Sequence, residues 1–331
     1  MKRSLILLLF VVGLCHFSWS NSAQPGLWSA GGGGGFTLLF PEDSSSFQKI
    51  QMLKEIVSIQ LYKGFAVVKG QYWMQNDEQD TIRMTAGYPI NSFMDKAQGT
   101  KRSEIYFDEL YQMKVSMNSE SVPLLKSEGE NEWNNDAENW YLWEACFNPD
   151  TVTLIEVYFI VNTNDATVRK GYSKSQLNGF IYLLESGASW KPPIGNGKIL
   201  IQLMDNMGLD DIHGAIPDSA FRYDEKSKIL KMEFQDLIPT AEDNIVITYN
   251  EKNPNFDFSA VLAQKDNFYG TIDELSTREL TEKDFIPMMF NDPYEIASDF
   301  GWGGNSNFWV ITLPILLVAL FGVLLIRRVK K

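Results

Sequence analysis

The stretch Val57-Ser58-Ile59-Gln60-Leu61-Tyr62-Lys63-Gly64-Phe65-Ala66-Val67-Val68-Lys69-Gly70-Gln71-Tyr72-Trp73 decides the fold class of this chain. Residues 57–61 alternate between apolar and polar side chains, which is the period of a β-strand with one buried face. A turn at residues 62–64 separates this run from a second one at residues 65–73, which ends before Asn76-Asp77. The stretch therefore predicts two short strands joined by a turn.

Further runs of the same kind lie along the chain. Residues 82–88 and 111–117 alternate with period two. Residues 151–161 are almost continuously β-branched or aromatic, which is typical of a central strand buried on both faces. Four more runs follow at residues 180–184, 199–203, 230–234 and 245–249. Turn residues separate these runs at near-regular intervals, as in antiparallel sandwiches.

The pattern predicts a mainly β chain with two consecutive antiparallel β-sandwich domains, followed by a single C-terminal transmembrane helix. The first domain is expected at residues 24–125 and the second at residues 140–250. The polar residues 126–139 between them are expected to be a linker. Residues 251–307 are expected to be a partly helical juxtamembrane segment and tether, with a short helix within residues 271–284.

Both ends of the chain are apolar. Residues 1–23 carry Lys2 and Arg3, an uncharged run and then small polar residues, which is the layout of a cleaved signal peptide. A lipoprotein signal at Cys15 is disfavoured by the bulky Leu14 before it. Residues 308–326 contain no charge and would span roughly 28 Å as a helix. The basic residues 327–331 predict a cytoplasmic tail, and so a single pass with the N-terminus outside, periplasmic or extracellular.

The charge of the chain restricts its partners. The formal net charge is −13, and the basic ends hold no Asp or Glu, so the exported part is more acidic still. Such a surface repels nucleic acid and anionic lipid headgroups. Cys146 is the one cysteine left after signal cleavage, which excludes an internal disulfide. The chain also lacks Asn-x-Ser/Thr sequons, and together these absences favour a bacterial envelope protein.

The residues needed for common catalytic and metal sites are scarce. A catalytic triad or dyad would need His213, which lies in the acidic stretch 210–214 and is better interpreted as a loop histidine. Zinc sites need several Cys or His ligands, and after signal cleavage the chain retains only Cys146 and His213. The acidic turns at residues 76–80 and 205–211 do not match a calcium-binding loop, and the glycines 31–35 do not match a nucleotide-binding loop. We therefore expect no catalytic, cofactor-binding or metal-binding residues, and no enzyme activity.

A carbohydrate-active or glycan-binding protein is the alternative. Asp and Glu are abundant enough to supply a pair of catalytic carboxylates. Four tryptophans in or near the second expected domain could stack on sugar rings: Trp133, Trp140, Trp143 and Trp190. At strand spacing, however, aromatic side chains belong to the core more often than to a binding platform.

Two resemblances bear on function. Residues 57–61 and 64–72, with Asn76 and Gly87-Tyr88-Pro89-Ile90, resemble the opening of a VIT domain, the vault/inter-alpha-trypsin β-sandwich. The chain is also similar to uncharacterised bacterial envelope proteins with domains of unknown function. In those proteins a second sandwich contains a "Leu-x-Ser/Thr-Gly-x-x-Trp" element, here residues 184–190. The resemblance implies an extracytoplasmic interaction module without catalytic residues.

VIT proteins often carry a von Willebrand A domain, whose metal site needs Asp-x-Ser-x-Ser. Asp43-Ser44-Ser45-Ser46-Phe47 departs from that pattern at its last position, so metal-dependent adhesion is not implied. We expect a membrane-anchored ectodomain that binds another envelope or extracellular protein. A third hypothesis is an assembly factor that docks the glycine run 31–35 on an exposed edge strand of a neighbour.

Overall fold

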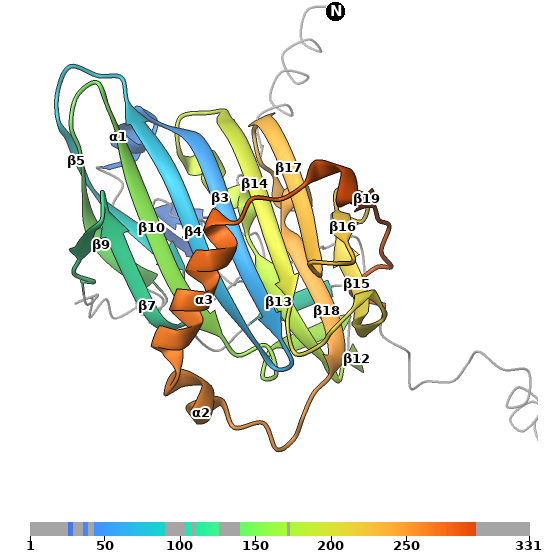
Figure 1. Ribbon diagram of the computed structural model, residues 1–331. Coiled ribbons are helices and arrows are strands. Elements are labelled where there is room, and N and C mark those ends of the chain that lie inside the picture. Colours follow the sequence, from blue (N-terminus) through green and yellow to red (C-terminus); the bar gives the residue numbers. More distant parts are fainter. Residues whose placement is uncertain are drawn as a thin grey trace, which may run out of the picture. The chain divides into compact units, whose positions relative to one another are not determined.

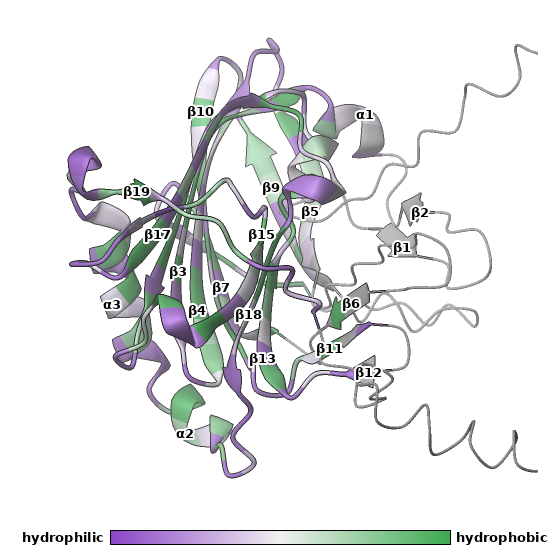
Figure 2. Cartoon of the chain, turned by 90° about the vertical axis from the view of Figure 1, so that its right-hand side faces the viewer, coloured by the Kyte–Doolittle hydropathy of each residue, from purple (hydrophilic) through white to green (hydrophobic). Residues whose placement is uncertain are grey.

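The computed structural model describes residues 26–28, 36–38, 43–89, 103–106, 110–125, 140–170 and 173–295. The described part is mainly β, as expected, and two layers of strands enclose its core (Figure 2). The expected signal peptide at 1–23, linker at 126–139, membrane helix at 308–326 and tail at 327–331 all lie outside the described residues. Among the residues described, no helix is both long and apolar enough to cross a membrane.

The first layer is a nine-stranded sheet in the order β19-β16-β17-β14-β3-β4-β10-β7-β8 (Figure 1). Its strands are β3 (Ile50–Tyr62), β4 (Phe65–Asn76), β7 (Leu110–Met117), β8 (Glu120–Val122), β10 (Thr151–Val161), β14 (Ile194–Leu203), β16 (Arg222–Asp224), β17 (Ile229–Leu237) and β19 (Ile286–Pro287).

The predicted pair of strands at residues 57–73 is confirmed as the hairpin of β3 and β4. Tyr62 pairs with Phe65 across a turn at Gly64, whose φ of 108° suits glycine because it has no Cβ. β10 lies between β4 and β7 in the interior of the sheet. Its inward residues reach the core, while Tyr158 and Ile160 are buried on the opposite face. The prediction of a central strand buried on both faces is therefore confirmed.

The two expected sandwiches differ from what the structure shows. β14 pairs in parallel with β3, from Asn196 beside Lys54 to Leu203 beside Leu61. Strands from both expected domains thus lie in one sheet, and the described residues up to Glu295 form one compact unit. The physical reason is that β3 has hydrogen-bonding groups along both edges. β4 fills one edge locally, whereas a strand from the second half of the chain fills the other.

The second layer consists of smaller antiparallel sheets that pack against the inner face of the large one (Figure 2). β5 (Ile82–Pro89) pairs with β9 (Trp140–Phe147), and β13 (Leu177–Tyr182) and β15 (Ile212–Ile216) flank β18 (Ile245–Glu251). β6 (Ser103–Tyr106), β11 (Thr167–Lys170) and β12 (Ser173–Lys174) form a third small sheet. Short helices α1 (Ser44–Phe47) and η3 (Leu184–Ser189) precede β3 and follow β13. A separate pair, β1 (Gly26–Trp28) and β2 (Phe36–Leu38), flanks the glycine run in sequence.

Two helices cover part of the outer face of the large sheet. α2 (Phe258–Leu262) is capped by Asp257, whose carboxylate accepts from two backbone N–H groups. α3 (Lys265–Thr277) buries Tyr269 and Ile272 against β3, β4 and β10, and Leu275 on the same helical face against β14 and β17. The helix expected within residues 271–284 therefore exists but begins earlier, at Lys265, and ends at Thr277. The segment that contains it packs on the sheet.

Candidate functional site

The outer face of the nine-stranded sheet has a covered part and an open part. α3 and the segment after it as far as η6 (Glu282–Asp284) cross the face before β19 joins the edge of the sheet, whereas the upper ends of β3, β14 and β17 carry no helix (Figure 1). Two buried lysines hold the covering segments in place. The open part forms a groove.

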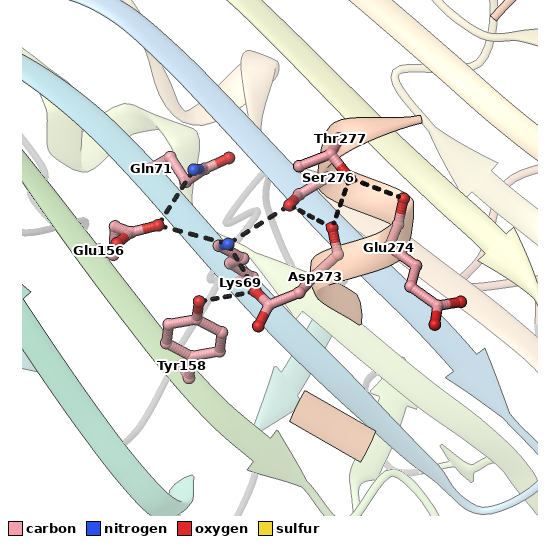
Figure 3. A network of polar contacts seen from close by, with 8 residues as sticks. All are labelled: Lys69, Gln71, Glu156, Tyr158, Asp273, Glu274, Ser276 and Thr277. Atoms are coloured by element: carbon pink, nitrogen blue, oxygen red, sulfur yellow. Dashed lines mark hydrogen bonds and ion pairs between the residues drawn. The ribbon is translucent and has the colours of Figure 1, made fainter. Parts of the chain in front are cut away.

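The first buried lysine is Lys69 on β4, which is 5% exposed. Its ammonium lies 2.6 Å from Oδ1 of Asp273 and 3.3 Å from Oγ of Ser276, both on α3 (Figure 3). Oε1 of Glu156 on β10 lies 3.3 Å away, and the Tyr158 hydroxyl donates to the same Asp273 oxygen at 2.7 Å. Two carboxylates and two hydroxyls therefore fix α3 over β4 and β10.

This network shifts the titration of its members. Burial alone would lower the pKa of Lys69, but the interactions with Asp273 and Tyr158 outweigh it and raise the pKa above its ordinary value. Burial raises the pKa of Tyr158 to about 12, because the neutral phenol is favoured under the helix. The Lys69 ammonium and the Tyr158 phenol both keep their neutral-pH forms in this environment.

The second buried lysine is Lys231 on β17, which is 1% exposed. Its ammonium contacts Oε1 of Glu282 at 2.6 Å and Oε2 of Glu233 at 2.9 Å, and lies 4.8 Å from the centre of the Phe285 ring. Arg222 pairs with the other oxygen of Glu282 at 3.3 Å. The hydrogen bond from Lys231 lowers the pKa of Glu282. This second contact fixes residues 278–287 against the sheet.

The groove has a volume of about 450 Å³ and lies at the open ends of β3, β14 and β17. Six outward side chains line it in two rows of three, set by the strand register: Lys54, Asn196 and Gln235, then Ile56, Lys198 and Glu233. Both rows lie on one face because alternate residues of a strand point to the same side. The lining combines ammonium, amide, carboxylate and apolar groups.

A β-bulge shapes one wall of the groove. Met52 pairs with Met74, but the next pair joins Lys54 to Trp73, so Leu53 is an extra residue in β3. The bulge turns Lys54 to the outer face, where its ammonium lies 4.6 Å from the centre of the half-buried Trp73 ring. Bulges commonly redirect side chains near functional sites.

The bulge also explains the glycine at the start of β14. A Cβ at Gly195 would lie 2.5 Å from the Leu53 carbonyl oxygen, which is closer than any side chain allows. Backbone therefore meets backbone at this point, with no side chain between the strands. Glycine in a strand often marks such a close approach of two backbones.

The groove carries positive charge in an acidic chain. Within the described part of the chain, Lys54 forms no ion pair with a carboxylate, and its contact is the Trp73 ring. Lys198 lies 3.5 Å from Glu233, but the same carboxylate also pairs with Lys231. Lys54 thus has no carboxylate partner there, and Lys198 shares Glu233 with Lys231 and lies near enough to Glu282 to help lower its pKa, while the whole chain has a net charge of −13.

A buried polar cluster lies on the inner side of the same strands. Glu55 is fully buried, and its Oε1 accepts a hydrogen bond from the Tyr182 hydroxyl at 2.8 Å. The Tyr182 and Tyr72 hydroxyls lie 3.1 Å apart. Burial, and then the charge of Glu55, raises the pKa of Tyr72 and Tyr182. The cluster ties β3 to β13 directly beside the groove.

The structure does not combine His213 and Cys146 in one site. His213 is on β15, exposed, with its Nε2 2.9 Å from the Glu295 carbonyl oxygen. Cys146 is a free thiol on β9, which belongs to a different sheet. His213 is therefore an exposed residue at the start of a strand rather than in a loop.

The tryptophans proposed as a sugar platform belong to the core where they are described. Trp143 and Trp190 are both 0% exposed, and the Trp190 ring lies 4.7 Å from that of Phe47. The side chain of Trp140 and all of Trp133 lie outside the described residues. The interpretation of these aromatics as core is confirmed for the two that are described.

The element at residues 184–190 is structural. η3 is buried, and Glu185 exchanges two hydrogen bonds of 2.9 Å with Asn244, one through its backbone and one through its carboxylate. Burial raises the pKa of Glu185. The element thus closes the sandwich at one end and leaves Glu185 no access to a ligand.

The carboxylates in the acidic turn at residues 205–211 accept hydrogen bonds from backbone N–H groups of this chain. Asp205 accepts from the Lys63 backbone at 3.0 Å, and Asp211 accepts from the Gly208 backbone at 2.9 Å. Over the described ranges, no group of three or more His, Cys, Asp or Glu side chains is placed to hold a metal ion.

Sequence reasoning did not single out Lys54, Trp73 or Lys198. A bulge and a pairing of strands 142 residues apart bring them together, and neither leaves a local pattern. One sequence pattern could have indicated Trp73. Since Tyr72 and Met74 on either side point into the core, strand alternation places Trp73 on the outer face.

No protein-family model matches the sequence, and the comparison with curated proteins gives no match. Among solved structures, the chain is similar to a candidate nutrient-binding protein of Legionella pneumophila. The identity is 13% and the TM-score 0.41, over 72% of this chain and 77% of that one.

Two peptidase-like structures are also similar. An M1 zinc metallopeptidase of Deinococcus radiodurans with bound Tyr-Ser-Ala matches at 5% identity and a TM-score of 0.32, over 61% of this chain and 43% of that one. Yeast LTA4 hydrolase matches at 10% identity and a TM-score of 0.34, over 70% of this chain and 32% of that one. The chain thus spans less than half of either enzyme. At these scores the likeness assigns neither a family nor an activity.

Proposed function

We propose that this chain is a membrane-anchored extracytoplasmic binding protein of the cell envelope and not an enzyme. The observation that carries the proposal is the groove over β3, β14 and β17. It is open, charged and set on a rigid sheet, and among its described lining residues no Ser, Cys or His is present to act as a nucleophile or base. The ammonium, amide, carboxylate and apolar groups of such a surface can hold a partner.

The anchoring part of the proposal rests on the sequence. The expected signal peptide and the uncharged residues 308–326, followed by basic residues, predict export and a single pass. Alkaline carbonate extraction of the full-length protein tests this directly. Retention in the membrane pellet supports the anchor, and release into the supernatant contradicts it.

The binding part is tested by crosslinking the full-length protein in cells, followed by affinity purification and mass spectrometry. We expect one dominant envelope or extracellular partner at near-equal amount. A variant with Lys54→Glu and Lys198→Glu should lose that partner if the groove makes the contact. Hydrolysis of a polysaccharide by the purified protein, abolished by a single Asp or Glu substitution, would contradict the non-enzymatic proposal.

A glycan ligand is the second candidate. One observation supports it, although it involves a different tryptophan from those proposed from the sequence. Trp143 and Trp190 are buried, but Trp73 is half-buried on the outer face, where the ammonium of the groove residue Lys54 lies 4.6 Å from the centre of its ring. A sugar-binding surface would therefore use Trp73. The VIT resemblance at residues 57–90 stays a prediction.

A further inference from the structure

We propose that the groove binds an acidic saccharide, with the sugar ring against Trp73 and its carboxylate between Lys54 and Lys198. This inference rests on the proposed function as a binding protein and names the ligand class of that site.

The charges of the groove select an anionic group. Lys54 is exposed. In the described part of the chain its ammonium contacts the face of the Trp73 ring and no carboxylate. Lys198 shares Glu233 with Lys231, whose ammonium is the closer of the two at 2.9 Å. A ligand carboxylate would complete the pairing of both groove lysines. Charge-assisted hydrogen bonds of this kind are the strong ones.

The positions of the two lysines suit one small anion. Lys54 is directly beside Asn196 on the parallel strand, and Lys198 follows two residues later on the same face. Diagonal neighbours of this type lie about 7–8 Å apart at the backbone, within reach of two long side chains that converge on one carboxylate.

The remaining side chains suit a sugar more than a simple anion. Asn196 and Gln235 are exposed and lie next to each other, and each amide offers two donors and one acceptor oxygen to hydroxyl groups. Ile56 in the groove and the Trp73 ring next to Lys54 supply apolar surface for the C–H face of a pyranose. The volume of about 450 Å³ falls in the range of ligand sites and holds one or two sugar units.

The overall charge argues against the other large anions. Nucleic acid and anionic membranes present many charges to the whole protein surface, which here has a net charge of −13. An acidic saccharide of one or two sugars carries one or two carboxylates, and a groove of this volume takes up that charge. The bulge at Leu53 and the close approach at Gly195 shape the wall of the groove that carries Lys54.

The test is isothermal titration of the full-length protein in detergent with oligogalacturonate. The fully methyl-esterified oligomer is the neutral control ligand, and inorganic phosphate is the simple anion. We expect oligogalacturonate to bind, the ester to bind at least tenfold more weakly, and phosphate to give no measurable heat.

Variants locate the binding. Lys54→Gln, Lys198→Gln and Trp73→Ala should each weaken it about tenfold or more. Lys228→Gln is the control, because Lys228 pairs with Glu225 outside the groove. Its side chain is 39% exposed, against 40% for that of Lys198. This variant should bind the ligand as tightly as the parent protein. Thermal melting checks that each variant is folded. If Trp73→Ala fails to fold, the titration of Lys54→Gln still tests the inference, because Lys54 is exposed.

Equal binding of acid and ester, or binding unchanged by Lys54→Gln, would overturn the inference. So would an absence of saccharide binding, and crosslinking then separates the two proposals. A protein partner lost in the Lys54→Glu and Lys198→Glu variant would leave the binding function intact and the ligand class wrong. If neither a saccharide nor a partner is found, both proposals fail.

Discussion

Lys69 and Asp273 meet across 2.6 Å although 204 residues separate them in the chain. The lysine side chain is 6% exposed and the aspartate 49% exposed, so the ammonium is the desolvated partner. An ammonium in this position needs its carboxylates, since a buried unpaired charge is costly. The pair therefore sets where α3 can lie on the sheet.

The first prediction concerns this pair. Asp273→Ala should lower the free energy of unfolding by about 1–3 kcal/mol, because Lys69 and the Tyr158 hydroxyl both lose an acceptor. Glu274→Ala, at the neighbouring position, is the control and should change it by less than about 0.5 kcal/mol. Urea unfolding followed by tryptophan fluorescence measures both. Equal effects would contradict the role of Asp273 as the anchor of the helix.

The second prediction is loss of stability at alkaline pH. Burial raises the pKa of Tyr62 and Tyr158 from 10.0 to about 12. A folded-state pKa above the unfolded value gives stability that is complete below the unfolded pKa and is lost as the pH rises through the folded one. Unfolding should therefore become easier between pH 10 and about 12.

Phenolate absorbance and far-ultraviolet circular dichroism, recorded along the same pH series, check this second prediction. The buried tyrosines should ionise together with the loss of β-signal. Full ionisation at pH 10 in a folded protein would contradict their burial.

The third prediction concerns the polar cluster between the layers. Tyr182→Phe should destabilise the fold by about 1–3 kcal/mol, because the buried Glu55 carboxylate loses a donor at 2.8 Å. Tyr72→Phe should cost less, since Tyr182 keeps its bond to Glu55. Denaturant unfolding of the two variants gives the comparison. The reverse order would mean that Tyr72 is the main donor to the cluster.

The fourth prediction compares two glycines. Gly195→Ala should destabilise the protein and weaken ligand binding, because its Cβ would meet the Leu53 carbonyl oxygen at 2.5 Å. Gly270→Ala, within α3, has nothing within 4 Å and should stabilise by up to about 1 kcal/mol. Thermal melting and the same titration separate the two effects. A neutral Gly195→Ala would show that the bulge is not rigid.

Local patterns predicted local structure well. The hairpin of β3 and β4, the twice-buried β10 and a helix near Leu275 could each be read from the sequence, because period, turn residues and β-branched content are local properties. The pairing of β3 with β14 could not be read, since either could have paired with a closer strand on the same criteria.

The same limit applied to the groove. Lys54 and Lys198 are unremarkable lysines in two separate strands, and the interaction of Lys54 with Trp73 depends on one extra residue in β3. Trp143 and Trp190 attracted attention as aromatic residues near polar turns, but packing placed them in the interior. Strand register, more than residue type, decided which aromatic side chain reached the surface.

The parallel pairing of β3 with β14 has a consequence for biosynthesis. Gln60 and Gln202 lie side by side in the sheet, yet Gln202 leaves the ribosome 142 residues later. At about 5–20 residues per second, one edge of β3 therefore stays unpaired for roughly 7–30 s. β3 is 13 residues long and rich in apolar side chains, and an open edge of that kind pairs readily with other chains. Nascent chains of this protein should accordingly depend on a chaperone that covers this edge until β14 arrives.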